Sequence, residues 1–376
     1  MPWKKVSAVD LREEFVALAG REGGKVRGLC RRYGISPTTA YKWLERHAAE
    51  GRAGLLDRSR RPHASPGRTA AAMEDRIVAL RDRHPAWGGR KLRRRLLDLG
   101  LADVPSPSTI TAVLRRHGRL DADDAVKHRA FIRFEQATPN ALWQMDFKGH
   151  FALRAGRCHP LTVLDDHSRF ALGLEACADE RWGTVQARLT GLFRRYGLPW
   201  RILVDNGAPW GSDAESQDTR LTVWLLRLDI PVSHSRPYHP QTQGKAERFH
   251  RSLVAELLER QPLADLDECQ RHFDAWRQIY NSERPHEGIG LQVPLARYRP
   301  SPRSFPETLP PLDYAGNDIV RTVDAAGLIS FQNRRFRLGK AFRGQPVALR
   351  PTDQDGQFNI CFGRHPIACI DLADAP

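Results

Sequence analysis

Apolar side chains recur at helical spacing over residues 10–47 and predict three short helices. In the second of these, Val26, Leu29 and Cys30 share one helical face, and Gly34 ends the pattern. A short polar turn follows before apolar residues resume. The pattern is therefore a helix, a tight turn and another helix.

The third helix is expected to begin at Ser36, which can cap it, with Pro37 in its first turn. Ala40, Trp43 and Leu44 form its inner face. Such a pair of helices is typical of a helix-turn-helix unit, whose second helix enters the major groove, although an ordinary helical hairpin is the alternative. We predict DNA contacts from four polar residues of this helix: Thr38, Thr39, Lys42 and Arg46.

A basic, proline-containing stretch at residues 58–69 separates this first domain (1–57) from a second helical unit at 70–120. In that unit Leu92, Leu96 and Leu99 repeat at helical spacing, and basic residues lie off the stripe. The unit is either a second DNA-binding unit or a helix pair with a solvated basic face. As possible DNA contacts we name Lys91 and Arg94.

From about residue 138 the period changes to that of strands. In LWQMDFKGHF, apolar residues alternate with polar ones, and two further strands meet at the sequence DDHSR. Helices near 183–196 and 218–228 alternate with the short strands RILVDNG and PVSHS, and a long helix follows from Thr242. We predict a mixed sheet with helices on its faces over residues 135–300.

Residues 301–311 are rich in proline and predict a second linker. The segment 312–374 has short apolar runs with turn residues at regular spacing, which predicts a small β-barrel. The expected architecture is therefore multidomain: all-α DNA-binding units, an α/β core and a small all-β domain.

The charge of the chain indicates what kind of partner it binds. The net charge is +15, and residues 1–130 hold 28 Lys and Arg against 15 Asp and Glu, so most of the excess lies in the helical units. Such an excess points to a polyanion, either nucleic acid or an anionic membrane surface. The first residues lack a signal-peptide core, and no apolar run reaches membrane-spanning length. Six scattered cysteines predict neither a zinc site nor a disulfide framework, so we expect a cytoplasmic, reduced protein.

Three carboxylates are candidates for chemistry. Asp146 lies within a predicted strand, on the face opposite Trp143 and Met145, and Asp205 ends the apolar run ILV. Glu247 lies in the first turns of the long helix and is the single acid of residues 235–250, which also hold five Lys, Arg and His side chains. Taken singly, each acid also has a structural explanation: a solvent-facing strand residue, a turn, and a helix N-terminal charge.

Acids from two strands and a helix can converge where the strands of an open sheet end. Clustered carboxylates repel one another unless a cation neutralises them, and Mg²⁺ prefers oxygen ligands and phosphates. Two such ions would support in-line displacement at phosphorus. In this arrangement basic and amide groups of the same segment would hold a DNA backbone: His239, Gln243, Lys245 and Arg248.

The ordered motifs WQMD, LTVLDDHSR, ILVDNG and YHPQTQGKAERFH resemble those of the DDE transposases of bacterial insertion sequences, in the branch whose core is similar to retroviral integrases. The later segment YNSERPHEGIG, starting at Tyr280, resembles the segment after the core in these transposases. The resemblance covers about 130–300 and implies an RNase H-like fold with Mg²⁺-dependent strand cutting and joining, for which Mn²⁺ can substitute.

Carried over by position, the catalytic and metal-binding acids of the family fall on Asp146, Asp205 and Glu247. Forty-one residues (206–246) separate the last two, more than is usual in the family, and we place the excess in the polar stretch 211–219. Asp165 and Asp166 are rival acids, but their DDHSR context is typical of a hairpin turn.

Three functions stay open on the sequence. The first is a transposase that binds the ends of its mobile element, assembles as a homo-oligomer on DNA, and joins those ends to target DNA. The second is a DNA-binding regulator of transposition whose core is inactive. The third is a simple RNase H-type nuclease, which would not need the helical units at residues 1–120.

Overall fold

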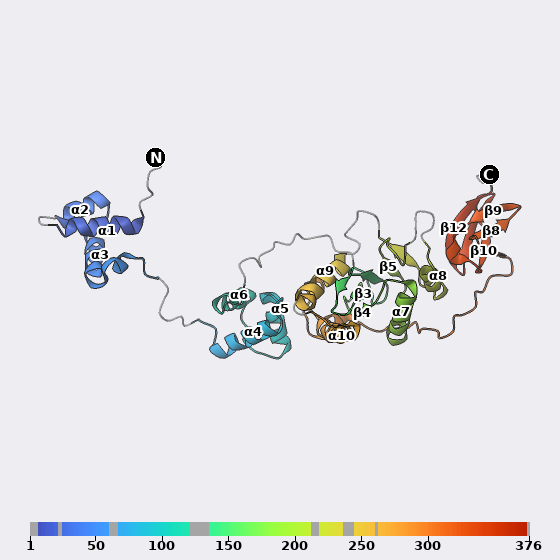
Figure 1. Cartoon of the computed structure of the whole chain (residues 1–376), viewed down its shortest axis with the longest axis horizontal. Helices are drawn as coiled ribbons and strands as arrows, with labels where there is room; N and C mark the ends of the chain where they lie inside the picture. Colours follow the sequence, from blue (N-terminus) through green and yellow to red (C-terminus); the bar gives the residue numbers. More distant parts are fainter. Residues whose placement is uncertain are drawn as a thin grey trace. The chain divides into compact units, whose positions relative to one another are not determined.

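The computed structural model describes seven stretches of the chain: residues 7–21, 25–59, 67–120, 135–211, 218–235, 244–259 and 262–373. The chain divides into two compact units, Met1–Arg68 and Thr69–Pro376 (Figure 1). None of the described helices is long and apolar enough to span a membrane.

The first unit is the predicted helix-turn-helix. Its elements are α1 (Ala8–Ala19), α2 (Val26–Tyr33), α3 (Pro37–Glu50) and the 3₁₀ turn η1 (Gly51–Leu55). Gly34 ends α2 with φ +63°, a left-handed conformation that glycine adopts without a Cβ clash. Ser36 then caps α3, because its hydroxyl accepts the Thr39 amide. The three helices close over Phe15, Ala40 and Trp43.

The second helical unit is part of the larger compact unit. It contains α4 (Ala71–Arg83), α5 (Gly89–Asp98) and α6 (Pro107–Arg116). Leu92 and Leu96 of α5 are buried with Trp87 and Ile110, as the apolar stripe predicts. Leu99, the third residue of that stripe, is instead 55% exposed. Ile279 of the central domain packs against the same cluster.

The central sheet is mixed, as predicted. Its strands are β1 (Trp143–Phe147), β2 (Phe151–Ala152), β3 (Arg157–Asp165), β4 (Ala171–Cys177), β5 (Ile202–Val204) and β6 (Val232–His234). β3 pairs antiparallel with β1, β2 and β4, while β5 pairs parallel with both β1 and β6.

Helices cover both faces of this sheet (Figure 1). They are α7 (Trp182–Tyr196), α8 (Arg220–Arg227), α9 (Gly244–Leu253) with its π-helical continuation η3 (Val254–Leu258), and α10 (Leu266–Ser282), followed by the short η4 (Glu287–Ile289) and α11 (Pro294–Arg297). The cluster on one face joins Trp143 and Met145 to α7 and α8. The other joins Leu164 and Leu174 to α9 and α10. This layering is the mixed sheet with helices on both faces that the sequence predicts, and it agrees with the RNase H-like fold that the resemblance implies.

The strands after residue 312 are present, but the small β-barrel predicted there is not found as a closed barrel among the described residues. The strands are β7 (Ile319–Thr322), β8 (Leu328–Phe331), β9 (Arg334–Arg337), β10 (Pro346–Pro351), β11 (Gln357–Phe362) and β12 (His365–Asp371), with a 3₁₀ turn η5 (Lys340–Phe342). They form a four-stranded sheet, β12-β11-β10-β7, and a separate β8–β9 hairpin. Both share one apolar core, but within the described residues no strand pairing connects them into a closed cylinder.

Candidate active site

Asp146 lies on the α9 side of the sheet. Trp143 and Met145 enter the cluster under α7 and α8, so the alternation along β1 turns Asp146 to the opposite face. Thr162, opposite Asp146 on β3, donates its hydroxyl to the Asp146 backbone oxygen over 2.9 Å. Its oxygen lies 2.9 Å from His250 Nε2 of α9, and His250 Nδ1 is 3.9 Å from Asp146 Oδ2. α9 is thus fixed close to this acid.

Asp205 follows the last residue of β5, which lies parallel to β1. Gln144 stands opposite Leu203, so two further residues along each strand lead to Asp146 and Asp205 at the same end of the sheet. Asp205 Oδ1 accepts hydrogen bonds from the Gly207 amide, at 3.0 Å, and from the Trp210 indole. The carboxylate is therefore oriented by its own loop.

Glu247 is an exposed side chain near the start of α9. The helix buries Ala246, Phe249 and Leu253, so Glu247 lies outside its apolar face. Within the part of the chain that the structure describes, no hydrogen bond or ion pair holds its carboxylate. Its location depends on how α9 is placed.

Electrostatics connect these acids. Burial raises the pKa of Asp146 to about 7, and repulsion from Asp205, Glu180 and Glu247 adds to this shift. Glu180, which the sequence reading missed, lies between β4 and α7 and contacts His159 Nδ1 at 2.8 Å. An acid just after a predicted strand was the available signal, because strand ends gather at the site.

His250 is a neutral ring in this site. Burial lowers its pKa to about 4, and the charge of Lys148 acts in the same direction. Because the Thr162 hydroxyl donates its hydrogen to Asp146, the neutral ring must donate Nε2–H to Thr162. His250 thus serves as a fixed contact between α9 and β3.

The described residues do not form a preassembled metal site. Among the described residues, no group of three or more His, Cys, Asp and Glu side chains is close enough together to hold a metal ion. The predicted acids come from neighbouring elements and interact electrostatically, but they do not lie close enough together to share one metal ion in this arrangement.

Known families match along the chain. The sequence pattern described as "Integrase core domain" matches residues 136–240 and, in a second form, residues 228–294. "IS481 family transposase, C-terminal domain" matches residues 318–375. "Helix-turn-helix domain" matches residues 11–63 and "Homeodomain-like domain" matches residues 39–114.

Relatives agree with these matches. An insertion element IS476 protein of Xanthomonas euvesicatoria is 27% identical over 256 residues, which cover 65% of this chain and 70% of that protein. An insertion element IS407 protein of Burkholderia multivorans is 25% identical over 42% of this chain and 54% of its own length. Together these similarities support an insertion-sequence transposase of the DDE type.

Solved structures that are similar to the chain include the HTLV-2 integrase catalytic core domain in complex with magnesium. It is 17% identical to the transposase, covers 43% of it and 99% of its own chain, and has a TM-score of 0.34. The catalytic core domain of BIV integrase is 24% identical over 42% of the transposase and 92% of its own chain, with a TM-score of 0.32.

The predicted DNA contacts of the helix-turn-helix fall into two groups, residues exposed on α3 and residues with structural partners. Thr38 and Lys42 are exposed on α3. The Thr39 hydroxyl lies 2.9 Å from the Ser36 hydroxyl and belongs to the helix cap. Arg46 donates to the Leu56 backbone oxygen over 2.8 Å and lies over the Trp43 ring, so it holds α3 to the segment after it.

The α3 surface also carries an aromatic residue that the sequence reading missed. Tyr41 is 59% exposed beside Lys42. Its exposure follows from the helical period, since Ala40 and Trp43 occupy the buried face. An exposed phenol at this position can both stack and hydrogen-bond.

On α5 the two predicted contacts also differ. Arg94 forms an ion pair with Asp98 at 2.8 Å and keeps a partly exposed side chain. Lys91 was predicted to contact DNA, but its side chain is partly buried: burial lowers its pKa to about 8, and the charge of Arg284 adds to this. Lys91 therefore lies on the side of α5 that meets the central domain.

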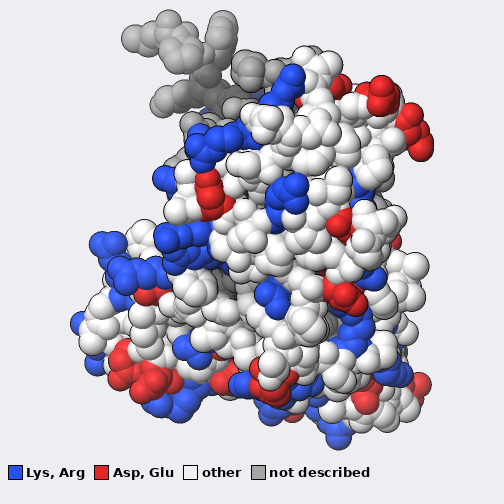
Figure 2. All heavy atoms as spheres, turned by 90° about the vertical axis from the view of Figure 1, so that its right-hand side faces the viewer, with Lys and Arg blue, Asp and Glu red and all other residues white. Residues whose placement is uncertain are grey.

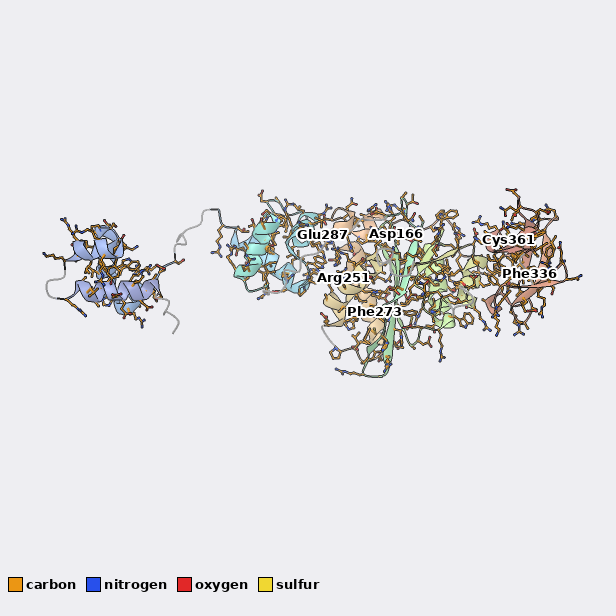
Figure 3. The ribbon with its side chains drawn as sticks, turned by 90° about the horizontal axis from the view of Figure 1, so that it is seen from above. Asp166, Arg251, Phe273, Glu287, Phe336 and Cys361 are labelled. Carbon is orange, nitrogen blue, oxygen red and sulfur yellow. The ribbon has the colours of Figure 1, made fainter. Side chains whose placement is uncertain are left out.

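The loop before α9 lies partly outside the described residues, and with it His239 and Gln243. Arg248 contacts Glu287 at 3.3 Å on the surface. Lys245 forms an ion pair with Asp166, a fully buried carboxylate in the turn between β3 and β4 (Figure 3). The predicted hairpin turn at DDHSR is present, and both of its acids point inward.

Proposed function

We propose that the transposase binds the ends of its mobile element and cuts and joins DNA strands, using divalent metal held by Asp146, Asp205 and Glu247. The observation that carries this proposal is the state of Asp146. Burial raises its pKa to about 7, with repulsion from Asp205, Glu180 and Glu247 adding to the shift and a hydrogen bond from the Phe147 backbone opposing it. Acids gathered at one end of the sheet repel one another, and a bound cation would relieve that repulsion.

The donor set fits a hard cation, since all three groups are carboxylates. Mg²⁺, as two ions, or Mn²⁺ in its place, would activate the attacking oxygen and stabilise the leaving oxygen at phosphorus. The protein's own residues supply the rest. Trp210 and Gly207 orient Asp205, Thr162 and His250 fix β1 against α9, and the helix presents Glu247.

Basic side chains around these acids suit a phosphate backbone. Arg251 is exposed one helical turn after Glu247 on α9, and Lys148 follows β1. We propose that these two side chains lie along the DNA at the site. Sequence recognition would come from α3, whose exposed Thr38, Tyr41 and Lys42 can reach base edges.

The face of the molecule seen in Figure 2 carries Lys and Arg interspersed with Asp and Glu. This agrees with the nearly balanced charge after residue 130, where 31 Lys and Arg stand against 29 Asp and Glu. We infer that DNA is held at local sites, with the strongest general attraction from the helical units. Pairing of two element ends calls for a homo-oligomer assembled on DNA.

The test uses the full chain, Mg²⁺ and duplexes bearing the sequences that flank its coding region. We expect nicking and strand joining by the wild type, and loss of both in Asp146→Asn, Asp205→Asn and Glu247→Gln, with end binding retained. These changes keep size and remove charge. End binding without any nicking by the wild type would instead support an inactive regulator. Cleavage without preference for these ends would support a simple nuclease.

A further inference from the structure

We propose that Asp166 and Lys245 form a positioning pair that sets the distance between the strand carrying Asp146 and the helix carrying Glu247. Neither residue belongs to the set of predicted catalytic acids, and neither touches the reacting atoms in this proposal. The inference rests on the proposed function, because it concerns how two of the proposed metal ligands are brought together.

Asp166 is a buried junction between three segments. Its Oδ1 accepts from Gln144 Nε2 at 2.8 Å and from the Lys245 ammonium, and its Oδ2 accepts the Gln136 backbone amide at 2.8 Å. Asp166 is fully buried, and the Lys245 side chain is 18% exposed. A carboxylate in such a place requires these donors, so the three segments are held to one point.

Two partners of Asp166 each lie two residues before a proposed metal ligand in the chain. Gln144 precedes Asp146 by two residues on β1, so both side chains leave the same face of the strand. Lys245 precedes Glu247 by two residues in the first turn of α9. One carboxylate therefore links the element of the first acid to that of the third.

The rest of α9 has separate anchors. Phe249 is buried with Trp276 and Tyr280, and the His250 ring contacts Thr162. These contacts hold the middle of the helix, whereas the ion pair of Lys245 anchors its first turn. Since Glu247 is exposed, its position is set by the backbone between these anchors rather than by contacts of its own.

An ionic junction suits this task better than an apolar contact. A buried ion pair adds little net stability, because desolvation offsets the attraction, but its geometry is narrow. Residues that orient metal ligands in this way affect metal affinity strongly when removed, by about 10- to 100-fold. The expected signature of the pair is therefore a change in metal binding that is separable from folding.

The experiment compares Lys245→Met, Asp166→Asn and the double variant in the full chain. Mn²⁺ alone is the probe, with its binding measured by calorimetry and folding measured by thermal melting. Lys245→Met leaves a buried carboxylate without its cation and should lower the melting temperature. The double variant removes both charges and should recover the melting temperature, while its Mn²⁺ affinity stays about 10-fold or more below wild type.

Recovery of both melting temperature and Mn²⁺ affinity in the double variant would overturn the proposal, because the pair would then be structural only. Should the double variant not fold, Asp166→Asn alone, which keeps the size of the side chain, gives the same comparison: retained wild-type affinity contradicts the pair. Arg350→Met is the matched control. It breaks the Arg350–Asp318 pair, whose carboxylate is also buried, in the C-terminal sheet, and should leave Mn²⁺ affinity unchanged.

Failure of the proposed function would give a different set of Mn²⁺-binding results. In that case wild-type protein binds no Mn²⁺, or Asp205→Asn binds it as the wild type does. The positioning proposal is supported only when Asp205→Asn loses Mn²⁺ binding and the double variant loses Mn²⁺ affinity while keeping its melting temperature.

Discussion

The rings of Phe147 and Trp210 stack with their centroids 5.5 Å apart and an interplanar angle of 13°. Phe147 follows Asp146 in the chain, and the Trp210 indole donates to Asp205. The stack thus joins the ends of two parallel strands through the residues that adjoin or orient the two predicted aspartate ligands. It explains how the loop after β5 can keep a carboxylate aimed beside β1.

Trp210→Phe should therefore impair metal use while preserving the fold. Phenylalanine keeps an aromatic ring against Phe147 but cannot donate to Asp205. We expect a rise of about tenfold in the Mg²⁺ concentration that gives half-maximal strand joining. The measurement is an Mg²⁺ titration of joining on element-end duplexes.

Two variants frame that result. Trp200→Phe alters a tryptophan that is 52% exposed and should leave the titration unchanged. Trp210→Ala empties a buried site and should cost about 3–5 kcal/mol of stability. An unaltered Mg²⁺ titration in Trp210→Phe would show that the indole hydrogen bond has no part in metal binding.

Lys42→Ala and Tyr41→Ala should weaken binding to element ends more than binding to random DNA. Both side chains are exposed on α3, and a good base contact is worth about 1–3 kcal/mol of discrimination. Fluorescence anisotropy with end and random duplexes at one salt concentration measures the ratio.

Arg46→Ala is the contrasting change on the same helix. Its guanidinium donates to the Leu56 backbone oxygen and lies over Trp43. Its removal should therefore reduce the free energy of unfolding by about 1 kcal/mol and lower the melting temperature, with little change in the specificity ratio. If Arg46→Ala reduced the specificity ratio and Lys42→Ala did not, the assignment of the reading face would be reversed.

Arg251→Ala should reduce the dependence of DNA affinity on salt, with the logarithmic slope falling by about one unit, because each neutralised phosphate releases condensed counterions. The sequence placed Lys245 in this role as well. In the structure its ammonium is paired with Asp166, so Lys245→Met should leave the slope unchanged. Titrations of affinity against KCl separate the two, and a lower slope in Lys245→Met would place that side chain on DNA.

Lys91→Met should stabilise the protein at neutral pH. The pKa of Lys91 falls to about 8 in the folded state from its ordinary 10.5, so the folded state carries a penalty while the amine is charged. Below pH 8 this penalty is complete, on the order of 3 kcal/mol. As pH rises from 8 toward 10.5 the unfolded chain binds more protons than the folded one, so the penalty is progressively relieved.

The measurement is thermal melting of both proteins from pH 7 to pH 10. The variant should melt higher at pH 7, and the difference should shrink as pH rises. Arg94→Met, on the exposed side of α5, is the control and should show no such pH-dependent difference. A constant difference across this range would mean that the Lys91 amine keeps its ordinary pKa.

Local patterns determined the elements of this protein. Gly34, Ser36 and Pro37 specify the turn and the helix start through backbone conformation and capping, which depend on neighbours in the chain. The alternation across residues 143–147 turns Asp146 away from Trp143 for a similar reason, because side chains on a strand alternate wherever the strand lies. Helices and strands of the core were accordingly predictable.

Tertiary structure decided which charged groups are buried. Lys91, Lys245 and Asp166 belong to residue types that are normally exposed, so composition favours a solvent or DNA role for them. Their burial arises from packing against segments far along the chain, such as α10 against α5 and α9 against the turn after β3. The same holds for Glu180, whose effect on Asp146 depends on the pairing of β3 with both β1 and β4.

The C-terminal domain shows this division most clearly. Turn residues and apolar runs were enough to indicate short strands over 312–374. Whether those strands close into a barrel depends on hydrogen bonds between strands that are distant in sequence, and β8–β9 pair only with each other within the described residues. Strand existence is set by side-chain periodicity, whereas closure is set by which edges meet, and a one-dimensional pattern carries no information about edges.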